Sequence, residues 1–113
     1  MESWIKMDRN LREKSYTNSD LLRYLNQENE GVLYNTFVAI AESKPEDMGI
    51  IERVKQIASG TDKLSQRGVP GASLRMVAIA TLKSLGMNDF YENLTDDEKL
   101  DVKGIYYQES WPK

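Results

Sequence analysis

The segment LTDDEKLD holds four carboxylates within six positions, which makes it the first place to look for chemistry. A calcium loop would need alternating ligands and a central glycine, and the segment has neither. Thr95 and Glu98 have the spacing of a capping box, so acidic residues here fit the start of a helix. Asp97 and Asp101 would then lie one turn apart and repel each other by about 0.2–0.5 kcal/mol. A negative face retained at that cost suits a basic surface, and we predict that Asp96, Asp97 and Asp101 contact a partner.

Histidine and cysteine are both absent from the sequence. Histidine is the usual general base near neutral pH and the commonest metal ligand, and cysteine supplies the thiolates of zinc sites. Zinc sites, histidine-based triads and Cys-His dyads are therefore excluded for this chain. The glycine-rich stretch RGVPG lacks the Gly-Lys-Ser/Thr ending of a phosphate loop. We expect a protein that is not an enzyme and that binds no metal and no cofactor.

The charge balance indicates the class of partner. The 113 residues include 15 basic and 18 acidic side chains, a net charge of −3, whereas a nucleic-acid-binding protein is expected to show a basic excess or a basic run. A mildly acidic protein is better matched to a basic protein, because complementary charge accelerates encounter. No apolar stretch approaches the ~20 residues of a membrane span, and the N-terminal segment lacks a signal-peptide core. We expect a cytoplasmic protein without membrane contact.

The stretch SLRMVAIATLKSLG, residues 73–86, reads as one helix that is apolar on every side from Met76 to Ala80. Such a helix is normally enclosed by other elements. Apolar residues at helical spacing and capping residues predict the enclosing helices at 2–14, 20–28, 31–43, 45–60 and 95–110, with a short helix or turn at 87–94. No segment alternates with a period of two, so we predict no strand.

Local signals define the ends of these helices. Pro45 suits the first residue of the helix at 45–60, and Gly86 suits the C-cap of the helix at 73–86. Thr61 could cap one extra turn through Arg67 before the loop RGVPG. The length predicts one all-α domain of five to six helices over residues 1–113, with an N-terminal capping helix in 1–18, two helical hairpins in 19–86 and a C-terminal helix in 87–113.

Two of the expected helices are alike. VLYNTFVAIAES, from Val32, aligns with LRMVAIATLKSL, from Leu74, and each follows another helix with an apolar edge. Helix pairs that recur at ~40–47 residues are typical of HEAT-type solenoids. The second helix resembles the pattern of the HEAT-repeat family, an aliphatic residue, Arg, a small residue, Leu and then Leu-Gly, at Leu74-Arg75, Ala78, Leu82 and Leu85-Gly86. The similarity covers about two units in residues 19–86, although the first unit has Leu33 in place of the pattern's Arg.

The resemblance implies antiparallel hairpins whose second helices line a concave surface that faces a partner. Aligned positions on those two helices give Tyr34, Met76 and Lys83 as predicted partner contacts, whereas we expect Phe37 and Ile79 to pack in the core. An irregular helical bundle is the alternative fold, because it would bury the same apolar helices.

Aromatic residues near both ends have predicted roles of their own. Two repeats are fewer than the three or so that such stacks need, so Trp4 and Trp111 must cap the ends unless a partner does. Adjacent Tyr106 and Tyr107 point in different directions on a helix, so at least one is exposed. Because tyrosine is a favoured interface anchor, we include both among the predicted partner contacts.

These features favour a small, non-catalytic protein-binding module. Its most concrete form is an acidic inhibitor or immunity-type protein that neutralises a basic partner such as a toxin nuclease. One alternative is a nucleic-acid-binding HEAT-like domain, which requires six cations to converge: Arg53, Lys55, Lys63, Arg67, Arg75 and Lys83. Another alternative is a homo-oligomer, a structural subunit that associates with itself to cover its apolar helices.

Overall fold

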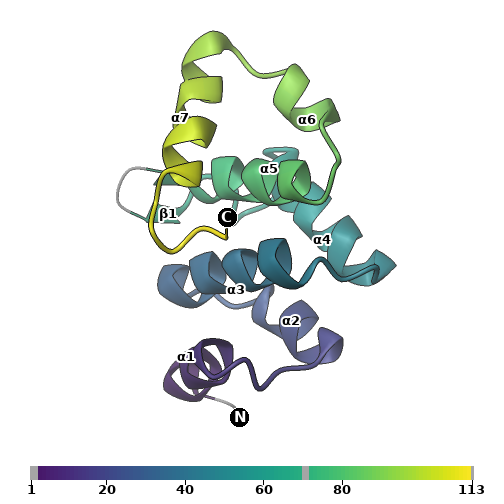
Figure 1. Ribbon diagram of the computed structural model, residues 1–113, viewed down its shortest axis with the longest axis vertical. Coiled ribbons are helices and arrows are strands. Elements are labelled where there is room, and N and C mark those ends of the chain that lie inside the picture. The colour runs from purple at the N-terminus through teal and green to yellow at the C-terminus, as the bar shows by residue number, and fades with distance from the viewer. Residues whose placement is uncertain (1–2, 70–71, 113) are drawn as a thin grey trace.

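The computed structural model describes residues 3–69 and 72–112. These residues form seven helices and one two-stranded hairpin (Figure 1): α1 Trp4–Arg12, α2 Asn18–Tyr24, α3 Glu30–Ser43, α4 Met48–Ala58, β1 Gly68–Val69, β2 Ala72–Ser73, α5 Leu74–Ser84, α6 Asp89–Glu92 and α7 Asp96–Tyr106. The predicted all-α class is confirmed. The predicted count of five to six helices is wrong, because the segment expected as a short helix or turn forms α6.

The hairpin is an element that the sequence did not lead us to expect. β1 and β2 run antiparallel, with Gly68 opposite Ser73 and Val69 opposite Ala72. A Cβ atom at Gly68 would collide with the carbonyl oxygen of Ala72, so this close approach requires glycine. Strands of two residues are too short to show a period of two. Pro70 and Gly71 of the predicted loop lie outside the described residues.

Side-chain caps set the start of six of the seven described helices. Asp47 caps α4 by accepting a hydrogen bond from the backbone N–H of Ile50. The prediction that Pro45 begins this helix is therefore wrong, because the chain enters helical geometry only after the Asp47 cap. Gly86 follows α5 with a φ of +88°, which agrees with the predicted C-terminal glycine.

Four helices form a row, which we call the central row. α3 packs against both α1 and α5, and α5 packs against both α3 and α7, so the row runs α1, α3, α5, α7 from the bottom to the top of Figure 1. α2 packs against α3 and α4, and α4 packs along α5. The row follows the long axis of a molecule that measures 40 × 28 × 28 Å.

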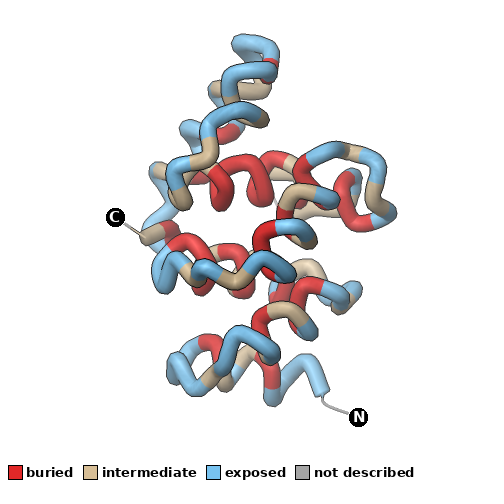
Figure 2. Tube along the Cα trace, turned by 90° about the vertical axis from the view of Figure 1, so that its right-hand side faces the viewer, coloured by how far each residue is buried: buried red, intermediate tan, exposed pale blue. Residues whose placement is uncertain are grey.

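The apolar helix α5 lies inside this arrangement. It contacts α3, α4, α6 and α7, and eight of its eleven residues are buried. Figure 2 shows the buried residues concentrated in the middle of the molecule and few at either end. Ala78 and Ala80 let neighbouring helices approach closely, and the buried hydroxyl of Thr81 donates to the Val77 carbonyl at 2.8 Å. Neighbours on several sides thus cover the residues that are apolar all round.

The two tryptophans do not both act as caps. Trp111 is buried, with its ring 6.4 Å from that of Tyr34 and 5.8 Å from that of Tyr106. Its indole N–H donates to the Ser84 hydroxyl of α5 at 3.4 Å. Trp4 does not cover the other end, because 56% of this residue is exposed and α1 buries only Met7 and Leu11, so at that end the predicted alternative of a covering partner stays a prediction.

The connector between α4 and α5 has turns where we predicted an extra helical turn from Thr61 to Arg67. Asp62 organises it instead, accepting from the Leu64 backbone N–H at 2.9 Å and from the Arg53 guanidinium at 2.6 Å. The Arg53 hydrogen bond lowers the pKa of Asp62 below its ordinary value. An ion pair of Arg67 with Glu30 also ties the connector to the start of α3.

Candidate partner-binding groove

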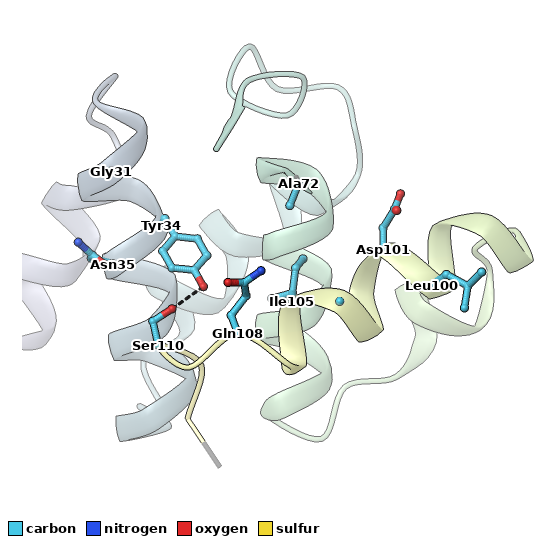
Figure 3. Close-up of a pocket in the computed structure, with 10 residues that line it drawn as sticks. Gly31, Tyr34, Asn35, Ala72, Leu100, Asp101, Ile105, Gln108 and Ser110 are labelled. Carbon is cyan, nitrogen blue, oxygen red and sulfur yellow. Dashed lines mark hydrogen bonds between the residues drawn. The ribbon is translucent and has the colours of Figure 1, made fainter. Parts of the chain in front are cut away.

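A groove of about 390 Å³ lies between α3 and α7, and we call it the α3/α7 groove. Figure 3 shows Tyr34 and Ser110 at its α3 end and Leu100 and Asp101 at its α7 end. Ten described residues line it: Gly31, Tyr34, Asn35, Ala72, Leu100, Asp101, Gly104, Ile105, Gln108 and Ser110. Three separate parts of the chain therefore build this site, namely α3, β2 and the segment from α7 to the C-terminal residues.

The lining combines apolar surface with hydrogen-bonding groups and negative charge. None of the ten lining residues is basic, and Asp101 contributes a carboxylate. Leu100 is 62% exposed and supplies apolar surface at the α7 end of the groove. The Tyr34 and Ser110 hydroxyls lie 2.8 Å apart in a hydrogen bond, and the Asn35 amide donates to Asp8 at 3.0 Å. These contacts hold the α3 side of the groove in one arrangement.

The start of α7 is held by the predicted capping box. The Thr95 hydroxyl accepts from the Glu98 N–H at 3.2 Å, and the Glu98 carboxylate accepts from the Thr95 N–H at 3.0 Å. Glu98 also pairs with the Arg75 guanidinium of α5 at 2.9 Å. Hydrogen bonds from the Thr95 backbone and from Arg75 lower the pKa of Glu98. Glu98 is therefore a structural residue of this cluster.

The other three carboxylates of the cluster remain exposed. Asp96, Asp97 and Asp101 form no ion pair with any residue in the described ranges. Asp97 and Asp101 lie one helical turn apart, as the sequence predicted, and Asp101 borders the α3/α7 groove. The negative face is therefore available to a partner, beside the apolar lining of the groove.

Three residues that we predicted to contact a partner lie outside the α3/α7 groove. The Lys83 ammonium lies over the ring of Tyr91 at 5.0 Å and that of Tyr106 at 5.7 Å. The Tyr106 hydroxyl donates to the Ala80 carbonyl at 2.8 Å, and burial raises the pKa of this phenol. Neither Lys83 nor Tyr106 lines the groove. Met76 is only 5% exposed, so its prediction as a partner contact is wrong.

The groove thus unites two predicted residues from distant segments, Tyr34 and Asp101. Tyr107 is 83% exposed, which confirms that at least one of the two adjacent tyrosines faces solvent. Sequence reasoning missed Leu100, Gly104 and Gln108 of the lining. The signal was present for Leu100 and Gly104, because positions spaced by four residues along α7 share one side of the helix with the acidic pair, whereas Gln108 lies beyond the end of α7.

Comparisons with known proteins do not identify the chain: no family model, no curated protein and no solved structure matches it. Within residues 3–69 and 72–112, no group of three or more acidic side chains is arranged to hold a metal ion. In the same residues, no helix is both long enough and apolar enough to span a bilayer.

Proposed function

We propose that the chain is a cytoplasmic, non-catalytic protein-binding module whose α3/α7 groove takes a basic segment of a partner protein. Its most concrete form is an acidic inhibitor or immunity-type protein that covers a basic partner such as a toxin nuclease. The observation that carries the proposal is the groove itself, which combines an exposed leucine, hydrogen-bonding groups and the unpaired Asp101 carboxylate with no basic lining residue. Such a surface is complementary to a lysine or arginine side chain.

The groove offers a specific mode of binding to that side chain. The aliphatic stem of an arginine or lysine would pack on Leu100 and Ile105, leaving its charged head near Asp101. Charge-assisted hydrogen bonds to a carboxylate are the stronger kind, and an arginine fork adds geometric specificity. Asp97, one turn from Asp101, would add attraction at longer range and steer the partner toward the groove.

The nucleic-acid alternative is disfavoured by the positions of the six cations that it requires. Five of them form ion pairs: Arg53 with Asp62, Lys55 with Glu52, Lys63 with Glu28, Arg67 with Glu30 and Arg75 with Glu98. The sixth, Lys83, lies over two tyrosine rings. Cations that are already engaged in this way contribute little to phosphate binding, which depends on uncompensated positive charge.

We also propose that α2–α3 and α4–α5 are two HEAT-like hairpins, flanked by α1 and by α6–α7 as terminal elements. The order of packing in the central row and the contact of α2 with α4 support this proposal, because each unit of a solenoid contacts its neighbours. A crystal structure tests it by superposition. If the α2–α3 pair does not superimpose on the α4–α5 pair, the irregular bundle is the better description.

The binding proposal is tested with the products of the genes that neighbour this one. Each is co-expressed with the full chain, and any captured product is titrated calorimetrically against three variants of the chain. Asp101→Asn removes the groove carboxylate and should weaken binding at least about tenfold, since a hydrogen bond to a charged group contributes about 1.5–3 kcal/mol. Asp89→Asn removes the same charge from α6, outside the groove, and should change affinity less than about twofold. Leu100→Ser should weaken binding without altering its salt dependence.

The expected partner is basic, and its affinity should fall as salt rises from low to high concentration. Equal affinities for the Asp101→Asn and Asp89→Asn variants would overturn the assignment of the groove. Capture of a partner without an excess of positive charge would overturn the proposed partner class.

A further inference from the structure

The large apolar side chains that the described part of the chain exposes are Trp4, Ile5, Met48, Leu100 and Tyr107. All but Met48 belong to α1, α7 or the C-cap of α7, the two terminal helices of the central row. Terminal units of a helical stack normally turn a polar face outward. We propose that these two terminal helices are halves of one interface, in which the exposed side of α1 in one copy docks on the exposed stripe of α7 in the next copy.

The α7 half is an exposed stripe with a flat centre. Leu100, Gly104 and Tyr107 are spaced i, i+4 and i+7, so they share one side of the helix. Val102 and Ile105 are buried, Val102 on the opposite side of the helix and Ile105 where α7 borders the α3/α7 groove. A Cβ atom built on Gly104 would meet nothing within 4 Å, so another backbone can approach closely between the leucine and the tyrosine.

The exposed residues of the α1 half have the same spacing, but two of the three are basic. Ile5, Arg9 and Arg12 are exposed at i, i+4 and i+7, while Met7 and Leu11 turn inward. Trp4 is also exposed, at the edge of the side that carries Met7 and Leu11. The α1 half therefore presents Ile5 followed by two guanidinium groups, of which Arg12 is paired with Asp8, with the Trp4 ring at its edge.

The charges at the two ends are complementary. Lys6 and Arg9 of α1 form no ion pair with a described residue, and neither do Asp96, Asp97 and Asp101 of α7. Lys103 adds one cation to the α7 side against those three carboxylates. Opposite charge selects a contact of α1 with α7 over a contact of α1 with α1 or of α7 with α7. The Arg9 and Arg12 guanidinium groups can also stack on the exposed Tyr107 ring.

The two halves cannot meet within one molecule, because α1 lies at one end of its 40 Å long axis and α7 lies in the opposite half, with α3 and α5 between them (Figure 1). A contact between different surfaces of two copies is heterologous, and it extends into an open chain unless the rotation between copies closes a ring. In this arrangement α1 of each copy lies against the exposed stripe of α7 in the preceding copy. The occupant of each end is thus a second copy of this chain.

This inference does not rest on the proposed function, although the two share residues. Leu100 and Gly104 both line the α3/α7 groove and belong to the α7 half, whereas α1 takes no part in the groove. A bound partner would therefore compete with assembly. Variants of α1 separate the two, since they should abolish assembly and leave the binding of a basic partner intact.

The test measures molar mass by size exclusion with light scattering over a range of protein concentrations at low salt. The wild-type mass should increase with concentration past that of two chains and decrease when salt is added. The double variant Trp4→Ser/Ile5→Ser and the double variant Leu100→Ser/Tyr107→Ser should each remain monomeric. Their equimolar mixture should give a species of two chains, because one intact α1 half meets one intact α7 half.

Met48→Ser is the matched control, since Met48 is exposed on α4 outside the central row and its change should leave assembly unaffected. Circular dichroism and thermal unfolding verify that all variants fold, and the wild-type salt series bears on the proposal independently of any variant. A wild-type protein that stays monomeric at the highest concentration overturns the inference. So does a mixture that stays monomeric, or a single double variant that still dimerises.

Discussion

Trp4 and Trp111 lie near opposite ends of the described chain, yet 56% of Trp4 is exposed and only 1% of Trp111. The difference arises from the chain segments that flank the terminal helices of the central row. After α7 the chain turns back and inserts Trp111 against Tyr34 of α3 and Tyr106 of α7. No described segment folds back over α1. One end of the row is therefore fastened by a buried aromatic cluster, whereas α1 is held by two buried apolar side chains and by the hydrogen bonds Asn35–Asp8 and Asn10–Tyr24.

The largest difference in stability is expected between variants of the two tryptophans. Trp111→Ala should lower the free energy of unfolding by about 3–5 kcal/mol, since it empties a site enclosed by three helices. Trp4→Ala should lower it by less than about 0.5 kcal/mol, because an exposed side chain loses few contacts. Urea unfolding followed by circular dichroism measures both values. Similar losses for the two variants would mean that the ends are not held differently.

The buried Tyr106 and the exposed Tyr107 should differ in their effect on stability at alkaline pH. Burial raises the pKa of Tyr106, so the folded state favours the neutral phenol. Its contribution to stability is complete below the unfolded tyrosine pKa of about 10 and is lost as pH rises through the higher folded value. Tyr106→Phe should cost about 1 kcal/mol at neutral pH, because the hydrogen bond to the Ala80 carbonyl disappears.

The same variant should lose less stability than the wild type as the pH rises through about 10, the unfolded tyrosine pKa, which urea unfolding at each pH would detect. The variant Tyr107→Phe is the control, as this neighbouring tyrosine is 83% exposed and contributes no burial to the cluster. If the wild type and Tyr106→Phe lose stability in parallel as the pH rises, the titration belongs to another group.

The helix caps at the two ends provide a third and smaller contrast. Thr95→Ala should cost about 1 kcal/mol, because the Thr95 hydroxyl caps α7 and its partner Glu98 is tied to Arg75 of α5. Ser3 caps α1 in the same way through the Lys6 N–H. Ser3→Ala should cost less than half as much in global stability, because α1 can open while the rest stays folded.

Hydrogen exchange distinguishes local opening from global unfolding in these cap variants. Amides of α1 should exchange faster than those of α5 in the wild type, and Ser3→Ala should accelerate exchange in α1 alone. Thr95→Ala should accelerate exchange in α5 as well as α7, because the Glu98–Arg75 pair joins them. Acceleration confined to α7 would show that the cap acts only on its own helix.

The sequence predicted the features that depend on neighbouring residues. The Thr95–Glu98 capping box, the C-terminal Gly86 and the enclosed helix α5 follow from spacings within a few turns. It did not predict which tryptophan is buried, because that depends on a turn that brings Trp111 back to Tyr34 across most of the chain. Met76 was predicted as a partner contact for the same reason. The alignment gives its position on a helix, but the neighbouring helices decide whether its side chain is buried.

In the candidate site, too, the features within one helix could be predicted and those that need several elements could not. The acidic face of α7 can be predicted from the spacing of Asp97 and Asp101, since both lie on one helix. The groove beside it cannot, because it requires α3, β2 and α7 to meet. The stripe of Leu100, Gly104 and Tyr107 is a middle case. Its spacing is visible in the sequence, but its exposure is known only once Val102 and Ile105 are seen to face the core.

The smallest predicted effect concerns the like-charged pair at the open side of α7. Asp101→Asn should raise the free energy of unfolding by about 0.2–0.5 kcal/mol, since it removes the repulsion from Asp97 one turn away and asparagine has a similar helix propensity. Asp97→Asn should have almost no effect, because it loses the attraction of a first-turn carboxylate to the helix dipole along with the same repulsion. Urea midpoints at low salt resolve differences of this size when the variants are measured together.

A gain in stability from Asp101→Asn would have a specific meaning if the same variant loses affinity for a basic partner. The carboxylate would then weaken the folded chain while strengthening its complex, as expected of a residue retained for binding. High salt should remove the stability difference, because both carboxylates are exposed. If Asp101→Asn destabilises the protein, Asp101 makes a favourable contact within the chain, and the acidic face of α7 is part of the fold in the same way as the Trp111 cluster.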